Sequence, residues 1–92
     1  MERLHAVVKG RVQGVGFRYF VLESATELDL TGWVRNRWDE SVEVVAEGEK
    51  QNLEQLLKAL ERGPRSAWVS GVDVEWEAAT QEFPSFNVRM SY

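Results

Sequence analysis

The sequence predicts an α+β fold in which two helices cover one face of an antiparallel sheet, with a short extra strand at the C-terminal end. Segments in which apolar and polar residues alternate are typical of half-buried strands, and two segments with apolar residues at helical spacing interrupt them. Glycines, one of them in a Gly-Pro pair, separate several of these segments. The chain has 92 residues and no cysteine, so we expect one domain, residues 1–92, built around a single core without disulfides.

The first half of the chain predicts a strand, a helix and a hairpin. Alternation over residues 4–12 indicates the first strand. Apolar residues at helical spacing predict a helix over residues 17–29. Residues 33–38 and 41–46 are rich in aromatic or β-branched side chains, and we expect them to pair as a hairpin through a short turn at Asp39-Glu40.

The second half predicts a helix and two strands. Leucines between residues 53 and 60 indicate a helix that starts near Gln51 or Asn52 and stops at Gly63-Pro64. Alternation over residues 72–77 predicts a strand, and residues 86–90 predict the short last one. The order β-α-β-β-α-β is that of a ferredoxin-like sandwich, with both helices on one sheet face. Polar side chains are expected on the open face, namely His5, Lys9, Glu43 and Glu75.

Charge and composition exclude several classes of function. The net charge of −4 argues against a general nucleic-acid binder, which needs a basic surface. Without cysteine, and with His5 as the only histidine, the chain cannot supply a thiolate nucleophile and is poorly equipped for a metal cluster. No signal peptide or long apolar span is evident, so we expect a cytoplasmic protein without membrane contact, with a monomer as the default state.

The turn between the first strand and the first helix is rich in glycine and reads Gly10-Arg11-Val12-Gln13-Gly14-Val15-Gly16-Phe17-Arg18. Such a turn lets several backbone N–H groups point at one place, where the following helix N-terminus adds partial positive charge. Arg18 adds a full charge and a planar set of donors that suits phosphate oxygens. The turn therefore indicates an anion site. A turn that only joins the strand to the helix is the alternative that the spacing leaves open.

The glycine turn does not match two common nucleotide-binding patterns. A dinucleotide fingerprint beginning at Gly14 requires glycine where Tyr19 stands, and a P-loop beginning at Gly10 requires glycine where Val15 stands. We therefore expect a single anionic group as ligand and no nucleotide cofactor. Asn36 is the second candidate residue, because asparagine is depleted in strands. A functional position and an edge or turn position both stay open for it.

Two groups of residues outside the turn are expected to be structural. Because aromatic side chains dominate core burial, the tryptophans are predicted to lie in the core or to cover a sheet face: Trp33, Trp38, Trp68 and Trp76. An acidic run is predicted to form a solvated surface: Glu40, Glu43, Glu47 and Glu49. No pair of carboxylates stands out as an acid–base couple.

Residues 10–18 resemble the first signature of the acylphosphatase family, and Gly32-Trp33-Val34-Arg35-Asn36 resembles the second. The resemblance spans nearly the whole chain and implies hydrolysis of the carboxyl–phosphate bond of small acyl phosphates without metal or cofactor. It implies that Arg18 and Asn36 are catalytic, with Asn36 orienting the attacking water. It also implies that inorganic phosphate is the product and a competitive inhibitor. The phosphoryl group would be bound by Arg18 and by the backbone of Gln13, Gly14, Val15, Gly16 and Phe17.

The chain departs from the family pattern at two turns. Asp29 and Glu40 stand where many relatives have glycine, which puts the local turn geometry in question but not the chemistry. Two other functions are known uses of such a fold or site and make different demands on the sequence. A non-enzymatic anion-binding module on the same fold would bind phosphate without hydrolysis. An RNA-recognition domain needs exposed aromatics and a basic sheet face, which the first and third strands do not offer.

Overall fold

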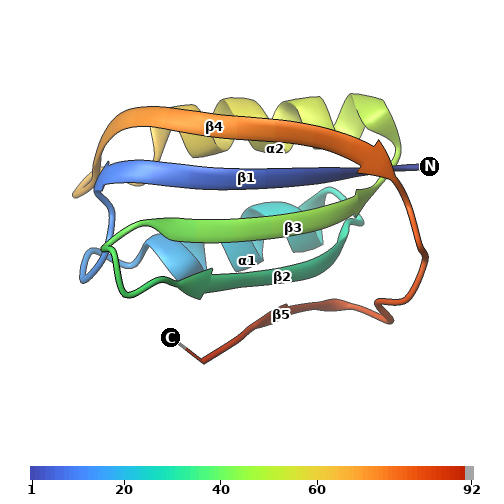
Figure 1. Ribbon diagram of the computed structural model, residues 1–92, viewed down its shortest axis with the longest axis horizontal. Helices are drawn as coiled ribbons and strands as arrows, with labels where there is room; N and C mark the ends of the chain where they lie inside the picture. The colour runs from blue at the N-terminus through green and yellow to red at the C-terminus, as the bar shows by residue number, and fades with distance from the viewer. Residues whose placement is uncertain (91–92) are drawn as a thin grey trace.

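The computed structural model describes residues 1–90 and has five strands and two helices. In chain order these are β1 (Glu2–Arg11), α1 (Phe17–Glu27), β2 (Thr31–Asn36), β3 (Val42–Gly48), α2 (Lys50–Arg62), β4 (Trp68–Ala78) and β5 (Phe86–Val88). The strands form one sheet in the order β4-β1-β3-β2-β5, and both helices pack on the same face (Figure 1). The predicted ferredoxin-like sandwich with an extra C-terminal strand is confirmed.

The sheet is mixed, because β5 runs parallel to β2 whereas the four longer strands pair antiparallel. The four strands of the β-α-β-β-α-β unit are antiparallel as predicted, and the extra strand, whose direction the sequence did not indicate, is parallel to its neighbour. The chain leaves β4 at one edge and crosses the end of the sheet through residues 79–85 (Figure 1). It enters β5 beside the start of β2, with Gly32 paired to Phe86, so both strands run in the same direction.

Several element boundaries differ from the expected ones. The strand predicted over residues 33–38 stops at Asn36, because Arg37 N–H donates to Ser41 O at 2.9 Å and Glu40 N–H to Arg37 O at 3.1 Å, which closes the hairpin turn. The first and fourth strands are longer than predicted, and the last strand ends at Val88 instead of residue 90. The first helix ends at Glu27, two residues early.

Asp29 and Glu40 give the chain its left-handed backbone at two turns, one after α1 and one between β2 and β3. Asp29 has φ 57° directly after α1, and Glu40 has φ 74° in the hairpin turn. Both lie in the left-handed region, where a side chain costs about 1–2 kcal/mol and glycine is preferred. The chain thus holds two left-handed turn positions with strained non-glycine residues.

The core lies between the sheet and the two helices. Its fully buried side chains come from both helices and from β1, β2 and β3, and include Leu4, Ala6, Val8, Val21, Val34, Val44, Leu53, Leu56 and Leu60, whereas β4 contributes only partly buried side chains. The prediction for the tryptophans holds for Trp33 but not for Trp38 and Trp68. Trp33 is buried against the open sheet face between the guanidinium groups of Arg35 and Arg89, 4.9 and 4.6 Å from its ring centre. Trp38 and Trp68 are 80% and 67% exposed, because one lies in the hairpin turn and the other begins an edge strand.

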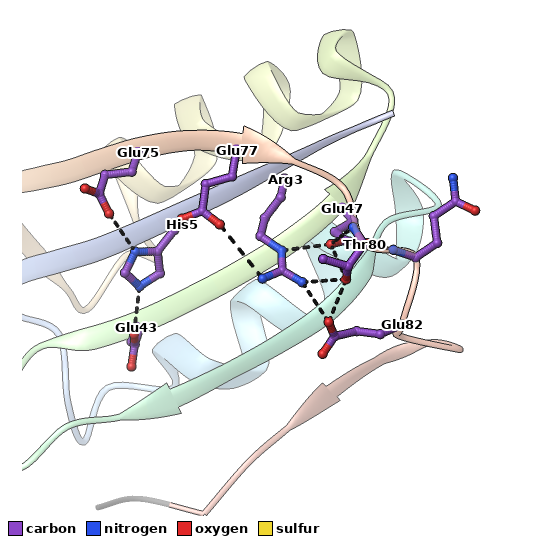
Figure 2. A network of polar contacts seen from close by, with 9 residues as sticks. Arg3, His5, Glu43, Glu47, Glu75, Glu77, Thr80 and Glu82 are labelled. Atoms are coloured by element: carbon purple, nitrogen blue, oxygen red, sulfur yellow. Dashed lines mark hydrogen bonds and ion pairs between the residues drawn. The ribbon is translucent and has the colours of Figure 1, made fainter.

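The open face of the sheet carries a polar network, as predicted (Figure 2). His5 lies between two carboxylates, with Nε2 2.7 Å from Glu43 Oε2 and Nδ1 3.4 Å from Glu75 Oε1. Arg35 Nε donates to Glu43 Oε1 at 2.8 Å. Burial would raise the pKa of Glu43, but the hydrogen bonds to His5 and Arg35 outweigh it and hold that pKa below its usual value. Lys9 pairs with Asp73 at 2.8 Å.

Glu47 contradicts the prediction of a solvated acidic run, because it is only 2% exposed. Its Oε2 accepts hydrogen bonds from Arg3 Nε at 2.8 Å, Thr80 N–H at 2.9 Å and Thr80 Oγ1 at 3.2 Å. Its Oε1 accepts from Gln81 N–H at 2.8 Å (Figure 2). The connection to β5 therefore covers this carboxylate and is held by it. Burial would raise the pKa of Glu47, yet the donors around it keep that pKa below its usual value.

Candidate active site

The glycine turn adopts the conformation of an anion-binding loop. Gly14 and Gly16 have φ 74° and 78°, and a Cβ atom added at either would meet nothing within 4 Å. Glycine is thus required by the backbone conformation and not by lack of space. Within residues 1–90, the N–H groups of Gly14, Val15 and Gly16 donate to no backbone carbonyl. Gly16 is also the N-cap of α1 and makes no side-chain cap, so the loop ends on an uncapped helix N-terminus.

A pocket of about 290 Å³ opens at this loop. The residues that line it come from the loop, the first turn of α1, the end of β2 and β5: Val12, Gly14, Gly16, Phe17, Arg18, Tyr19, Asn36 and Val88. The glycine loop and the β2–β3 turn lie at the same end of the sheet, at the left in Figure 1. The pocket therefore brings together the two predicted catalytic residues, Arg18 and Asn36, which are 18 positions apart in the chain.

Gln13 joins the loop to the hairpin. Its Nε2 donates to Arg37 O at 2.7 Å and to Ser41 O at 2.9 Å. These carbonyls flank the hairpin turn that follows Asn36, so one side chain sets the spacing between the loop and the strand end. The side chain of Gln13 is thus engaged with the protein, and only its backbone remains available for the predicted role in substrate binding.

The other predicted binding residues are placed in two ways. Gly14, Gly16 and Phe17 line the pocket, although the Phe17 side chain is buried in the core, so Phe17 presents mainly its backbone. Val15 packs against the core and does not line the pocket. Three lining residues were not singled out by the sequence: Val12, Tyr19 and Val88. Tyr19 could have been found from its place beside Arg18, whereas Val88 had no signal, because the position of the last strand was not predictable.

The described lining of the pocket contains one cation, Arg18, and no obvious base. Arg18 stands in the first turn of α1, where the helix dipole disfavours a cation, and that turn contains no acidic residue. Among the described lining residues none carries a carboxylate, an imidazole or a thiol. Within residues 1–90, the group of side chains that could converge on a metal is His5, Glu75 and Glu77, and it is not part of the pocket lining.

Known proteins resemble this chain in sequence and in structure. The Acylphosphatase family model matches residues 4–88. An acylphosphatase from Salinibacter ruber is 51% identical over 88 residues, which cover 96% of this chain and 93% of that one. The crystal structure of acylphosphatase from Bacillus subtilis superposes with a TM-score of 0.93 at 37% identity, covering 97% and 99% of the two chains.

A larger protein contains a similar unit. Full-length HypF, in a phosphate- and nucleotide-bound form, matches 99% of this chain with a TM-score of 0.87 at 27% identity, over 12% of its own length. No helix within residues 1–90 is long and apolar enough to cross a membrane. Family match, sequence identity over nearly the full length and shared fold agree, and the chain belongs to the acylphosphatase family.

Proposed function

We infer that the pocket hydrolyses small acyl phosphates, with Arg18 and the backbone N–H groups of residues 13–18 binding the phosphoryl group and Asn36 orienting the attacking water. One observation supports this assignment above all. A single pocket is lined by the two left-handed glycines, Arg18 and Asn36. The enzyme activity itself, acyl phosphate hydrolysis on a small molecule, follows from the family. What we propose here is the role of each residue.

Electrostatics favours a phosphoryl group at the loop. Free N–H groups and the N-terminal end of a helix both stabilise negative charge. A guanidinium group beside them can bind two phosphoryl oxygens with a fixed, planar pair of N–H donors, whereas a lysine acts as a point charge on a flexible chain. Arg18 and the N-terminal end of α1 are both positive, so both attract an anion that binds at the loop. We expect inorganic phosphate to bind the same place as product and competitive inhibitor.

Asn36 suits the task of holding a water molecule. Its amide both donates and accepts hydrogen bonds, so it can fix a water without adding charge. It ends β2, and the Gln13 bonds to the following turn hold that strand end against the loop. Phosphoryl transfer asks the protein mainly for such positioning and for charge stabilisation.

The reaction balances without a protein base. The water oxygen forms a bond to phosphorus as the bond between phosphorus and the acyl oxygen breaks. The carboxylate leaves with the electron pair of that bond, and both water protons end on phosphate oxygens. We propose that the substrate's own phosphoryl oxygen takes the first proton, which fits a pocket whose described lining has no acid or base. On this scheme the reaction needs no metal or cofactor. We also propose that the enzyme works in the cytoplasm as a single-domain monomer.

The experiment is a hydrolysis assay with acetyl phosphate in the presence of a metal chelator. We expect Arg18→Gln to lower kcat/KM roughly a thousandfold and to abolish competitive inhibition by phosphate. We expect Asn36→Ala to lower kcat about a hundredfold while the inhibition constant of phosphate changes little. Arg62→Gln and Asn52→Ala, both on α2, are the matched controls. Full activity of Asn36→Ala would overturn its role, and a wild-type enzyme that needs a metal would overturn the scheme.

A non-catalytic anion-binding module is the second candidate. The similarity to a small part of HypF favours it, because there a unit of this fold belongs to a larger protein. Calorimetry with inorganic phosphate separates the two. Phosphate binding together with no hydrolysis of any acyl phosphate would support the module, whereas turnover by the isolated chain would exclude it.

A further inference from the structure

The pocket is larger than a phosphoryl group requires. Its volume is about 290 Å³, and at about 30 Å³ for each water this is the space of roughly ten water molecules. Together with the oxygen that bridges to the acyl carbon, the phosphoryl group has one phosphorus and four oxygens, so it takes about half of that space on the same scale. The polar groups that would bind it are on the loop side, with Gly14, Gly16 and Arg18. The rest of the pocket must accommodate another part of the ligand.

Apart from Asn36, the remaining lining residues are apolar or aromatic, and two of them are partly exposed to solvent. Tyr19 is 65% exposed and Val88 is 42% exposed, whereas Val12 and Phe17 are buried in the core. A single exposed apolar residue needs no explanation in a soluble protein. Two of them beside a cluster of converging polar groups form the usual composition of a small-molecule site.

Register places Val88 beside the proposed water-binding residue. Val88 pairs with Val34 across the parallel ladder, and Asn36 lies two residues beyond Val34 on the same strand. Residues two apart on a strand share a sheet face, so Val88 and Asn36 are diagonal neighbours on one face. The hydrogen bond from Arg89 N–H to Val34 O, at 2.8 Å, fixes this register after β5 ends.

Tyr19 places an aromatic ring next to the proposed phosphate-binding arginine. It directly follows Arg18 in the first turn of α1 and is held there by the helix. An aromatic ring offers a flat apolar surface that interacts best with another flat group. The pocket is thus lined by Tyr19 from α1 and by Val88 from β5.

We propose that Tyr19 and Val88 form an acyl subsite that selects acyl phosphates with a flat apolar acyl group over those with a small one. The proposal rests on the assigned hydrolysis, since it places the acyl group next to the phosphoryl group. The flat acyl group packs on the tyrosine ring and against the valine methyls, and its burial lowers the free energy of the bound substrate. An acetyl group is too small to reach both side chains and gains little.

The test compares benzoyl phosphate with acetyl phosphate in wild type and variants. The readout is the ratio of their kcat/KM values. We expect Tyr19→Ala to lower this ratio about tenfold and Val88→Ser to lower it about threefold, from the apolar contact removed. Tyr19→Phe keeps the ring and should restore the wild-type ratio. Trp68→Ala and Met90→Ala, exposed apolar residues outside the pocket lining, are the matched controls.

The outcomes separate this proposal from the assigned function. If wild type hydrolyses both substrates and Tyr19→Ala lowers both rates equally, the acyl subsite is wrong and the hydrolysis stands. If wild type hydrolyses neither substrate, the assigned function fails instead. A fall in the ratio confined to Tyr19→Ala and Val88→Ser, with the phosphate inhibition constant changing much less, supports the subsite. The same fall in Trp68→Ala would overturn it.

Discussion

Glu47 offers the sharpest test of how the fold is held together. It is 2% exposed and accepts four hydrogen bonds, from Arg3, from Gln81 and twice from Thr80. Removing one member of a buried charged pair costs about 3–5 kcal/mol when its partner is left alone. Arg3 is not left alone, because its guanidinium also donates to Thr80 Oγ1 at 2.8 Å and to Glu82 at 3.3 Å. We therefore expect Glu47→Ala to lower the free energy of unfolding by about 3 kcal/mol, at the lower end of that range.

Glu47→Gln should lower the free energy of unfolding less than Glu47→Ala does, because it can keep most of the hydrogen bonds. Three of the four hydrogen bonds go to Oε2 and only Gln81 N–H binds Oε1. A glutamine that places its oxygen at the Oε2 position keeps the three bonds, and its NH₂ group then faces Gln81 N–H. One lost bond, with the charge of the acceptor also gone, corresponds to about 1.5 kcal/mol. The free energies of unfolding of Glu47→Ala and Glu47→Gln should thus differ by about as much as that of Glu47→Gln differs from wild type.

Urea denaturation measures these differences, and hydrogen exchange shows where they act. The slope of unfolding against urea should stay unchanged, since the same surface is exposed. Exchange of Arg89 N–H, which donates to Val34 O, should accelerate more than exchange of core amides in β1, because β5 is released first. Glu49→Gln, an exposed acidic neighbour that makes no side-chain cap, is the control. Values within 0.5 kcal/mol of this control for both Glu47 variants would refute the reasoning.

Three further predictions concern the turns, the loop and acid. Glu40→Gly should raise the free energy of unfolding by up to about 1 kcal/mol in urea, because it removes strain at φ 74°, whereas Glu40→Ala should not. Gln13→Met should lower the free energy of unfolding by about 2 kcal/mol, because it removes two hydrogen bonds. It should also lower kcat for acetyl phosphate more than it raises KM, because the hydrogen bonds that hold the end of β2 beside the loop, and with it Asn36, are lost. Folding lowers the pKa of Glu43 and Glu47 from 4.5, so stability from these groups is full above that pH and lost as pH falls through their folded-state pKa values. Urea midpoints measured from pH 7 to pH 3 should show this loss, and the double variant Glu43→Gln, Glu47→Gln should flatten it.

The sequence was sufficient for the elements that depend on local rules. The glycine turn, the two helices and the hairpin follow from spacing and turn residues, and each is present. The errors have a common cause. Trp38 belongs to a run with high strand propensity, but the strand ends earlier because Arg37 and Ser41 close the turn between them. Residue propensity indicates that a strand is present, but the hydrogen bonds across the following turn determine the residue at which it ends.

Glu47 and Val88 could not have been placed, for one physical reason. Alternation indicates which sheet face a side chain occupies, but not what covers that face. Glu47 occupies the open face, and what covers it is the connection that begins about thirty residues later in the chain. The same connection delivers β5 to the far edge, where its direction sets which residue reaches the pocket. Both depend on the path of residues 79–85, a segment with no periodic pattern to read.

These two residues are linked through that segment. Glu47 holds Thr80 and Gln81 at one end of it, and Val88 stands on the strand that follows its other end. Within the described chain, β5 is otherwise held by a short ladder with β2, by the backbone bonds from Gly32 to Ser85 and from Arg89 to Val34, and by the burial of Phe86 in the core. A three-residue edge strand has little stability of its own. The carboxylate that is buried on the open face therefore contributes to the wall of the pocket at the opposite end of the sheet, and the position of the proposed acyl subsite depends on an ion pair that does not touch the substrate.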